Sequence, residues 1–383
     1  MVRKILVTTG TRAEYGILRP VLREISKNKK LKLFLVVTGT HVSKKFGYTI
    51  KEIEKDGFPI YRRINLLPKG NKIYHMSMEL GKGIVEFTKI FKELQPDINL
   101  VLGDRDEMLA SALAAYHMNI PNAHIHGGDK SKGGLDEYTR HAITKISNIH
   151  FAATKKSYER IIRMGENPKN VFLTGSPSLD EIRDNKITTK NALEKKLNLK
   201  LTGKEILLVQ HSVTTQVESS KKQILNILQA ICKIKKTTIA IAPNSDAGNK
   251  EIFDNLFNYS KKFPFIRFFR SIPRADYLGL LKNCGILVGN SSSGIIEGSY
   301  FEIPVVNVGI RQEGRERGQN VTDVPDDDPN RLQKAILNSF KRKRKGKTTK
   351  YRIYGNGNSS KKIVKILEKT KLDKKLIQKQ IFY

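Results

Sequence analysis

The strongest constraint in the sequence is a regular alternation of short apolar runs with longer segments of helical period. In the first half of the 383-residue chain, the runs predicted as strands are Lys4–Thr9, Leu31–Thr38, Ile98–Leu102, Asn122–Ile125, Phe151–Ala153 and Val171–Leu173. The segments predicted as helices between them are Tyr15–Lys27, Ser43–Asp56, Tyr74–Leu94, Glu107–His117, Tyr138–Ser147 and Lys155–Met164. Apolar strands separated by helices are typical of a parallel sheet that is covered on both faces.

The same pattern restarts after the polar stretch Arg183–Leu201. The strands predicted there are Glu205–Val209, Thr238–Ala242, Ile266–Phe269, Ile286–Val288 and Val305–Val308. We therefore predict an α/β protein with two doubly wound, Rossmann-like domains, residues 1–175 and 176–355, joined near Gly175–Pro177. Residues 356–383 are predicted to form a C-terminal helix, Ser359–Lys369, that docks on a domain, and a basic tail whose end, Lys371–Tyr383, is loosely held.

The net charge of +33 raises the possibility of a nucleic-acid partner. The excess of lysine is spread along the chain, and its densest run, Lys341–Lys350, is most simply an exposed basic linker. Aromatic stacking platforms and known binding motifs are absent, so we expect no specific nucleic-acid partner. A signal peptide and an apolar stretch of the roughly 18 residues that span a bilayer are also absent. Two cysteines in apolar segments, Cys232 and Cys284, favour a reducing, cytoplasmic location.

Two polar motifs follow predicted strands near the start of the chain. Gly10-Thr11-Arg12 comes between a strand and a helix, where an anion can meet backbone N–H groups and a guanidinium; the alternative is an ordinary turn. Asp104-Arg105 follows Ile98–Leu102, and this pair is either part of a site or a mutually satisfied surface ion pair.

The densest group of titratable residues begins on the strand Asn122–Ile125. His124 and His126 alternate along it, and Asp129, Asp136-Glu137 and Arg140-His141 follow within a few residues. The His-Glu-x-x-His spacing of a zinc helix is absent, so an acid–base site fits this group better than a metal site. Asp136 is also placed to cap the next helix.

The second half carries polar loops at the ends of its predicted strands. These are Gln210–Ser212, Pro243–Gly248, Gly289–Gly294 and the segment from Arg311 to Arg317. The serines of Gly289–Gly294 open a helix and are suited to cradle a diphosphate, with Glu297 one turn inside to accept from ribose hydroxyls; simple serine capping is the alternative. Arg311, Arg315 and Arg317 would add cationic donors.

These motifs, in this order, resemble those of the hydrolysing UDP-N-acetylglucosamine 2-epimerases of the sialic-acid-pathway type. The resemblance extends to about Val324 and rests on Gly10–Tyr15, Gly103–Arg105, His124–Gly128, Arg140–Lys145, Pro243–Gly248, Gly289–Gly294 and Arg311–Val321. It implies a fold like that of GT-B glycosyltransferases with the active site in the interdomain cleft. It also implies a homodimer or a dimer of dimers, a UDP-sugar substrate, and no metal or other cofactor.

The resemblance implies a reaction in two steps. UDP leaves C1 of the sugar as the C2 proton is removed, which gives a 2-acetamidoglucal, and water then adds to give N-acetylmannosamine for sialic-acid-like sugar biosynthesis. The acid–base and diphosphate roles fall to Asp104, Asp136, Glu137, His126 and His211. Contacts with the UDP-sugar fall to Arg12, His41, Arg105, His124, Arg140, Asn244, Ser291, Ser292, Glu297 and Arg311.

Three alternatives stay open. A non-hydrolysing 2-epimerase would return UDP-N-acetylmannosamine, but that branch has Glu where this chain has His126. A hydrolysing enzyme could instead act on a 2,4-diacetamido sugar nucleotide. A glycosyltransferase of the same fold would need an acceptor. Asp129 stands where Glu is common in the family. The spacing from Asp129 to Asp136 is one residue longer than in the family.

Overall fold

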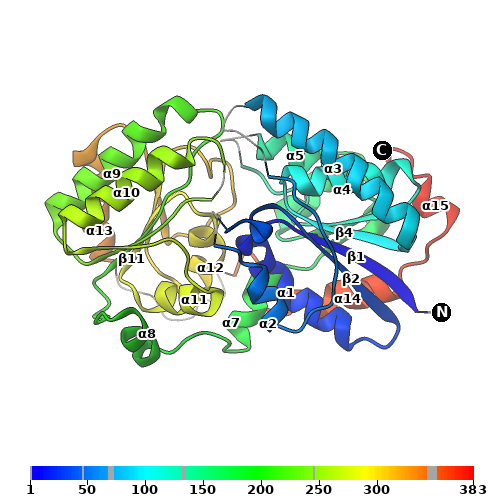
Figure 1. Cartoon of the computed structure of the whole chain (residues 1–383), viewed down its shortest axis with the longest axis horizontal. Coiled ribbons are helices and arrows are strands. Elements are labelled where there is room, and N and C mark those ends of the chain that lie inside the picture. The colour runs from blue at the N-terminus through cyan, green and yellow to red at the C-terminus, as the bar shows by residue number, and fades with distance from the viewer. Residues whose placement is uncertain (1, 45–46, 68–72, 132–134, 245, 343–351) are drawn as a thin grey trace. The chain divides into compact units, whose positions relative to one another are not determined.

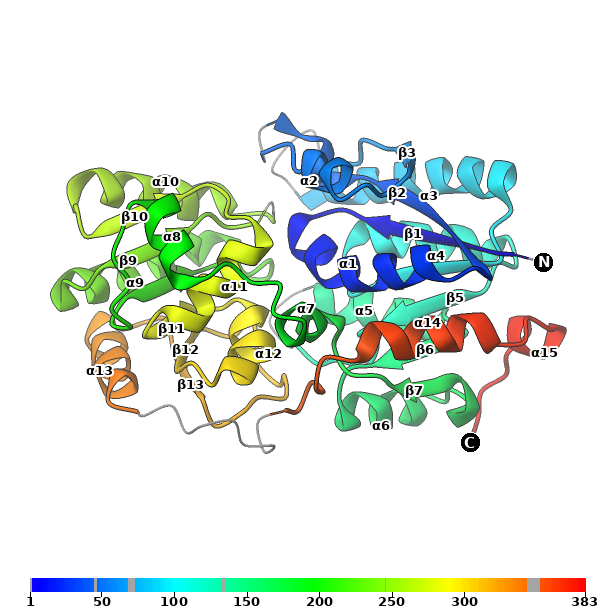
Figure 2. The ribbon, with the colours of Figure 1, turned by 90° about the horizontal axis from the view of Figure 1, so that it is seen from below.

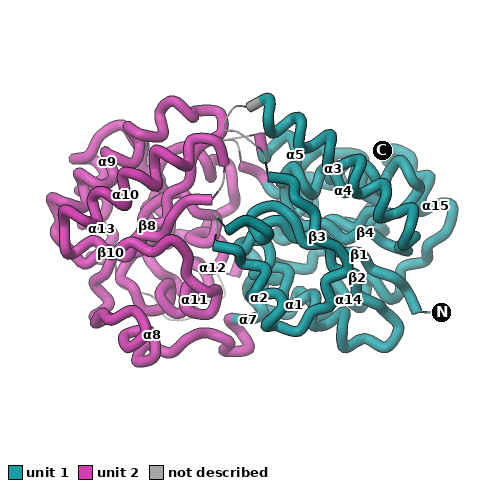
Figure 3. The backbone as a smooth tube through the Cα atoms, in the orientation of Figure 1, with its two compact units in different colours: residues 1–129, 136–181, 354–383 teal, residues 130–135, 182–353 magenta. Residues whose placement is uncertain are grey.

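The computed structural model describes residues 2–44, 47–67, 73–131, 135–244, 246–342 and 352–383. The chain divides into two compact units (Figure 3). Unit 1 comprises residues 1–129, 136–181 and 354–383, and unit 2 comprises residues 130–135 and 182–353. Most of the predicted basic linker Lys341–Lys350 lies outside the described residues.

Unit 1 is built on a seven-stranded parallel sheet in the order β3-β2-β1-β4-β5-β6-β7. Its strands are β1 (Arg3–Thr9), β2 (Leu31–Val37), β3 (Ile60–Arg63), β4 (Ile98–Leu102), β5 (Asn122–Ile125), β6 (Ile149–Ala152) and β7 (Val171–Leu173). Its helices are α1 (Arg12–Lys27), α2 (Ile50–Lys55), α3 (Ile73–Leu94), α4 (Asp106–His117), α5 (Asp136–Lys145), α6 (Lys155–Arg163), α14 (Ser359–Lys369) and α15 (Lys374–Ile377), with α7 (Asp180–Arg183) at the unit boundary. Short 3-10 turns are η1 (Gly39–Val42), η3 (Pro168–Asn170) and η4 (Pro177–Leu179).

Alternate residues of β1 supply the cores on the two faces of this sheet. Ile5 and Val7 pack with apolar side chains of α1 and α14, whereas Leu6 packs with those of α3 and α4. Figure 1 shows α1 and α14 on one side of the sheet and α3 and α4 on the other. A strand buried on both faces needs apolar residues at consecutive positions, which is why these strands are continuous apolar runs in the sequence.

Unit 2 repeats the architecture with a six-stranded parallel sheet in the order β10-β9-β8-β11-β12-β13. Its strands are β8 (Ile206–Val209), β9 (Thr238–Ile241), β10 (Ile266–Phe269), β11 (Ile286–Gly289), β12 (Val305–Val308) and β13 (Val321–Val324). Its helices are α8 (Lys190–Leu197), α9 (Ser220–Ile234), α10 (Asn249–Lys262), α11 (Arg274–Asn283), α12 (Ser292–Phe301) and α13 (Pro329–Phe340), with the turn η5 (Val217–Ser219). Ile206 and Leu208 pack under α9, α10 and α13, and Leu207 and Val209 face the opposite core.

The two doubly wound parallel sheets confirm the predicted fold class, with differences at the edges. The edge strands β3 and β13 were not predicted, because most of their residues are half-buried or exposed and form no apolar run. The predicted helix Ser43–Asp56 is wrong at Ser43 and at Gly47–Thr49, which precede α2, whereas Lys45 and Phe46 lie outside the described residues. The positive φ values of Gly47 and Tyr48 turn the backbone out of the helical region, and α2 begins at Ile50. The predicted position of the active site in an interdomain cleft stays a prediction.

The C-terminal helix is confirmed, and it belongs to unit 1. Helix α14 packs along α1 (Figure 2), with Ile363, Val364 and Leu367 buried in the unit 1 core. The Asp180 carboxylate accepts hydrogen bonds from the first N–H groups of this helix, at Ser359 (3.0 Å) and Ser360 (2.7 Å). The compact units therefore do not follow the linear boundaries 1–175, 176–355 and 356–383.

The prediction of a loosely held end, Lys371–Tyr383, is wrong. Lys379 Nζ lies 2.6 Å from the buried carboxylate of Glu166 and 2.6 Å from the carbonyl oxygen of Ser147, and Leu376 is buried. Burial by itself would raise the pKa of Glu166, but hydrogen bonds from His150, Lys379 and Lys145 lower it to about 2. A buried carboxylate needs such cationic partners, and the basic tail supplies one of them. Among the described helices, none has both the length and the hydropathy to cross a membrane.

Candidate active site

The predicted motifs follow neighbouring strands in each sheet. In unit 1 they come after β1, β4 and β5, and in unit 2 after β9, β8, β11 and β12. Because all these strands are parallel, their carboxyl ends lie along one edge of each sheet, which is where open α/β sheets bind ligands.

In unit 1 the structure brings together Asp104, Glu137 and Arg140. Arg140, on α5, contacts the Asp104 carboxylate directly, and its Nη1 lies 3.1 Å from Glu137 Oε2. The Arg140 side chain is 1% exposed, whereas those of Asp104 and Glu137 are 23% and 19% exposed. A buried guanidinium thus holds two carboxylates that both keep an accessible edge. Two such groups, held in fixed positions, are what a proton-removing and a proton-donating step require.

Arg140 stays charged in this position. Burial would lower its pKa, but the charges of Asp104 and Asp129 outweigh that effect and raise it. Sequence reasoning assigned Arg140 to the substrate, whereas the structure turns its donors toward Asp104, Glu137 and the carbonyl oxygen of Asp129 (3.2 Å). Asp136 is the first residue of α5, one position before Glu137.

His126 is bound on both sides by other side chains of unit 1. Its Nδ1 lies 3.0 Å from Asp129 Oδ2 and its Nε2 lies 2.9 Å from Ser176 Oγ. The residue is 6% exposed and has a φ of 65°, a conformation that non-glycine residues rarely adopt. Neither Asp129 nor Ser176 was predicted as a site residue. Asp129 lay inside the quoted motif, but no local signal pointed to Ser176, which is 50 residues away along the chain.

His124 and His41, both predicted to contact substrate, are engaged inside the protein. His124 Nε2 lies 2.7 Å from the carbonyl oxygen of Gly103, and its Nδ1 lies 3.2 Å from Thr144 Oγ1. His41 has hydrogen bonds to Thr9 and Thr49. Burial lowers the pKa of His124 to about 3 and that of His41 to about 4, so both rings are neutral. His41 is placed to hold the loop after β1, and His124 is placed to hold the loop after β4.

The loop Gly10-Thr11-Arg12 does not offer its first N–H groups to an anion. Those of Gly10 and Thr11 donate to Glu14 Oε2, at 3.1 and 2.9 Å, and the Thr11 hydroxyl accepts from the N–H of Glu14. This reciprocal pair is a capping box at the start of α1. The predicted backbone cradle is therefore filled by the chain's own carboxylate, and Arg12, the first residue of α1, is the cationic group at this position.

Arg105 and Glu107 lie against the same loop. Arg105 Nε lies 2.9 Å from Glu107 Oε1. A Cβ atom at Gly10 would lie 1.9 Å from that same oxygen, so a larger residue there would displace the Glu107 side chain. Burial, followed by the charge of Glu107, raises the pKa of Glu14 to about 8, and Glu14 Oε1 has no hydrogen-bond partner among the described residues. Burial thus favours the protonated form of Glu14, a buried acid that the sequence did not reveal.

In unit 2 the predicted residues His211 and Asn244 meet at the ends of β8 and β9. The N–H of Asn244 donates to His211 Nδ1 at 3.1 Å, so a neutral His211 ring carries its proton on Nε2. Asn290, after β11, holds the His211 backbone from both sides, with 2.7 Å to its N–H and 2.8 Å to its carbonyl oxygen. The histidine is thereby oriented as a hydrogen-bond donor.

The loop after β11 leads into α12 as predicted. Ser291 caps this helix, accepting from the N–H of Ser293 at 3.4 Å, and Ser292 is its first residue. Arg311 joins the same loop, because its Nη1 donates to the carbonyl oxygen of Asn290 at 3.3 Å. The structure therefore groups Ser291, Ser292 and Arg311 with His211 around Asn290, at a helix N-terminus suited to an anion.

Glu297 lies apart from that group. Its side chain is 3% exposed and accepts from Arg274 Nη2 at 2.6 Å, which leaves the predicted ribose contact without support in this structure. Arg274 was missed, although it follows the predicted strand Ile266–Phe269 by a few residues, where the rule that ligands bind at strand ends would have drawn attention to it. Within the described ranges, no cluster of three His, Cys, Asp or Glu side chains is suited to a metal ion.

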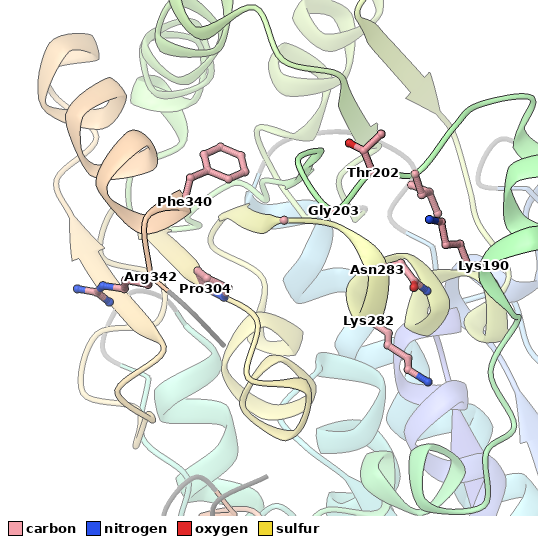
Figure 4. A pocket seen from close by; sticks show the side chains of 10 residues that line it. Lys190, Thr202, Gly203, Lys282, Asn283, Pro304, Phe340 and Arg342 are labelled. Atoms are coloured by element: carbon pink, nitrogen blue, oxygen red, sulfur yellow. The ribbon is translucent and has the colours of Figure 1, made fainter. Parts of the chain in front are cut away.

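A pocket of about 370 Å³ lies elsewhere in unit 2, and Figure 4 shows Phe340, Pro304 and Asn283 around Gly203. Gly203 and Pro304 precede β8 and β12, whereas the candidate loops follow these strands. The pocket is therefore at the opposite ends of the strands and is not part of the candidate site.

Comparison with known proteins gives a match to the family model described as UDP-N-acetylglucosamine 2-epimerase over residues 23–368. A UDP-N,N'-diacetylbacillosamine 2-epimerase (hydrolyzing) of Legionella pneumophila is 38% identical over 380 residues, which cover 99% of both chains. The polysialic acid biosynthesis protein P7 of Escherichia coli is 37% identical over 326 residues, covering 84% of this chain and 83% of that protein.

Solved structures agree with the fold. The UDP-GlcNAc 2-epimerase of Neisseria meningitidis bound to UDP-GlcNAc has a TM-score of 0.80 at 20% identity, covering 96% of this chain and all of that chain (100%). The Methanocaldococcus jannaschii UDP-GlcNAc 2-epimerase in complex with UDP-GlcNAc and UDP has a TM-score of 0.79 at 23% identity, covering 95% and 99%. The chain belongs to the UDP-N-acetylglucosamine 2-epimerase family, in its hydrolysing branch.

Proposed function

We propose that this protein converts a UDP-linked 2-acetamido sugar into the free C2 epimer and UDP. The observation that carries the proposal is the pair of partly accessible carboxylates, Asp104 and Glu137, held by one buried arginine. Relatives with 38% and 35% identity are named hydrolysing 2-epimerases, which supports the same reaction type.

The chemistry explains why two carboxylates are needed. The C2 proton is not next to a carbonyl group, so its removal is feasible only as the C1–O bond to UDP breaks and C1=C2 forms. Water then adds its hydroxyl group to C1, while C2 receives a proton on the opposite face. The sum is sugar nucleotide plus water giving the epimeric free sugar plus UDP. No electrons pass to or from another molecule, so the proposal requires no redox cofactor.

Within this scheme, Asp104 and Glu137 accept and donate the protons at C2, with Asp136 beside them. His211 would donate from Nε2 to the leaving diphosphate, because Asn244 occupies its Nδ1. Arg311, Ser291 and Ser292 would hold the same diphosphate through hydrogen bonds. Arg12 and Arg105 stay proposed as contacts with the UDP-sugar. Arg140 and His126 act through these residues and not on the sugar.

Two substrates fit this reaction. UDP-N-acetylglucosamine is the substrate that the sequence motifs imply, and its product, N-acetylmannosamine, would serve sialic-acid-like sugar biosynthesis. A 2,4-diacetamido sugar nucleotide is the second candidate, because the Legionella relative named for UDP-N,N'-diacetylbacillosamine matches along 99% of this chain. The two sugars differ from each other only in the substituents at C4 and C6, away from the reacting carbons C1 and C2.

The deciding experiment offers each sugar nucleotide separately and follows the products by NMR. Formation of free UDP together with the C2-epimeric free sugar is expected, in the absence of any acceptor. A product that keeps the sugar–UDP bond would establish the non-hydrolysing reaction instead, and turnover that depends on an added acceptor would indicate a glycosyltransferase. The ratio of kcat/KM for the two substrates then identifies the physiological one.

We also propose a cytoplasmic homodimer or dimer of dimers. The free thiols of Cys232 and Cys284 are consistent with a reducing compartment. Sedimentation at several protein concentrations tests the assembly, and a single monomeric species throughout would contradict it.

A further inference from the structure

A chain of hydrogen bonds in unit 1 connects Ser176 to the carboxylates of the proposed acid–base pair. It runs from Ser176 Oγ to His126 Nε2 (2.9 Å), from His126 Nδ1 to Asp129 Oδ2 (3.0 Å), and from the Asp129 carbonyl oxygen to Arg140 Nη1 (3.2 Å). Arg140 in turn holds Asp104 and Glu137. Every link up to Arg140 is buried, so water does not compete for these hydrogen bonds.

The proton positions along this chain follow from the donors available. An ionised Asp129 is an acceptor only, so His126 must donate from Nδ1, and in the neutral ring Nε2 must then accept. Ser176 has one hydroxyl hydrogen, which it gives to His126. Ser178 Oγ, 2.9 Å from Ser176 Oγ, is then the donor in the pair of serines.

Ser176 is fixed in place independently of its hydroxyl group. Its N–H donates to the carbonyl oxygen of Tyr354 at 2.8 Å, and the residue has no exposed surface. The far oxygen of Asp129, Oδ1, is held as well, by the hydroxyl of Ser157 at 2.7 Å. His126 therefore lies between two anchored partners, which fits a residue held at a φ of 65°.

We propose that Ser176 is a positioning residue for the reaction. Asp129 sets the tautomer of His126, and the Ser176 hydroxyl holds the other side of the ring, at Nε2. Through His126 and Asp129 it keeps Arg140, Asp104 and Glu137 in position. This inference rests on the proposed function, because it assigns Ser176 to the acid–base steps at C2. His126 becomes part of the support, which explains why both of its nitrogens are turned toward the protein.

The order Asp129, His126, Ser176 is also that of a nucleophilic triad, but the chemistry is different. A nucleophilic serine must reach a substrate, and Ser176 is completely buried. Its second neighbour is another buried hydroxyl, Ser178, so the chain of hydrogen bonds leads into the protein. The arrangement orients groups and forms no covalent intermediate.

The first test is made on the unmodified protein. With isotope-labelled histidine, NMR of the ring nitrogens reports which nitrogen carries the proton, and the His126 signals are assigned by their loss in His126→Gln. We expect Nδ1 to carry a proton and Nε2 to accept. A proton on Nε2, with or without one on Nδ1, would overturn the proposal, because Ser176 would then be an acceptor.

The second test compares Ser176→Ala with Ser178→Ala. Both remove one buried hydroxyl group of the same size, but only the first removes the donor to His126. We expect Ser176→Ala to lower kcat about tenfold or more, with KM and UDP affinity unchanged and with a shifted His126 Nε2 signal, because that nitrogen loses its donor. Ser178→Ala should keep kcat within about twofold and leave the His126 Nε2 signal unchanged.

A merely structural role of Ser176 would lower the thermal stability of both variants alike and leave kcat per folded molecule unchanged, and that result would overturn the inference. An unmodified protein that converts neither sugar nucleotide would instead refute the proposed function. The two failures are therefore distinguishable.

Discussion

Each unit carries a group of candidate site residues, and the two groups differ in the kind of side chain and backbone contact that they contain. In unit 1 the site consists of charged side chains that hold one another, with Arg140 buried between Asp104 and Glu137. In unit 2 it consists of backbone groups, amides and hydroxyls around Asn290, with His211 held as a neutral donor. The difference indicates a division of labour. Fixed carboxylates suit proton transfer at carbon, whereas oriented donors suit a diphosphate that gains charge as it leaves.

The largest expected effect is a loss of turnover when an acid–base residue of unit 1 is replaced. Glu137→Gln keeps the shape of the side chain but removes its ability to transfer a proton, so we expect kcat to fall about a thousandfold while UDP affinity stays unchanged. Steady-state kinetics and calorimetry with UDP measure the two quantities. Glu86→Gln, at a half-exposed position of α3, is the control. An equal loss of turnover and of UDP affinity would show that Glu137 binds and does not catalyse.

The next effect tests unit 2 alone. Arg311→Ala removes a cationic donor beside Asn290, and we expect UDP affinity to fall about tenfold to a hundredfold, as for the loss of hydrogen bonds to a charged group. The matched control is Arg331→Ala, whose side chain is 56% exposed. If UDP binds Arg311→Ala and the unmodified protein equally well, the diphosphate is held elsewhere.

A smaller effect is expected at the C-terminal tail, Lys371–Tyr383, which packs on unit 1. Lys379→Met removes one cationic partner of Glu166, and we expect a loss of about 2 kcal/mol in the free energy of unfolding, measured by denaturant titration. Lys375→Met, at an exposed position of α15, should have no effect. The pKa of Glu166 is lowered to about 2, so its contribution to stability is present above pH 4.5 and is lost as the pH falls toward 2. Equal stability of the two variants would show that the contact of Lys379 with Glu166 does not hold the C-terminal end in place.

The last effect is one of pH dependence, and it is expected for Glu14→Gln. The folded-state pKa of Glu14 is about 8 against an ordinary 4.5, so between these values the folded protein binds a proton that the unfolded chain has released. Stability must then fall as the pH rises through this window. The variant should match the parent near pH 5 and lose less stability toward pH 8, as measured by thermal unfolding at a series of pH values. Parallel stability curves would show that Glu14 is ionised throughout.

Much of this architecture could be predicted from the sequence because it is local. The apolar runs at Lys4–Thr9 and Ile286–Val288 mark strands buried on both faces, and the polar motifs directly after them mark the sheet edge that binds ligands. The edge strands β3 and β13 were not predicted, because a strand with one exposed side needs no apolar run.

What the sequence by itself determined is the class of fold, the order of its elements and the family to which the chain belongs. Only the tertiary structure decided which polar groups are partners. It gave the N–H groups of Gly10 and Thr11 to Glu14, paired Glu297 with Arg274, and enclosed His126 between Asp129 and Ser176. The physical reason is that a buried polar group must find a partner, and packing, not sequence distance, determines which one lies within reach.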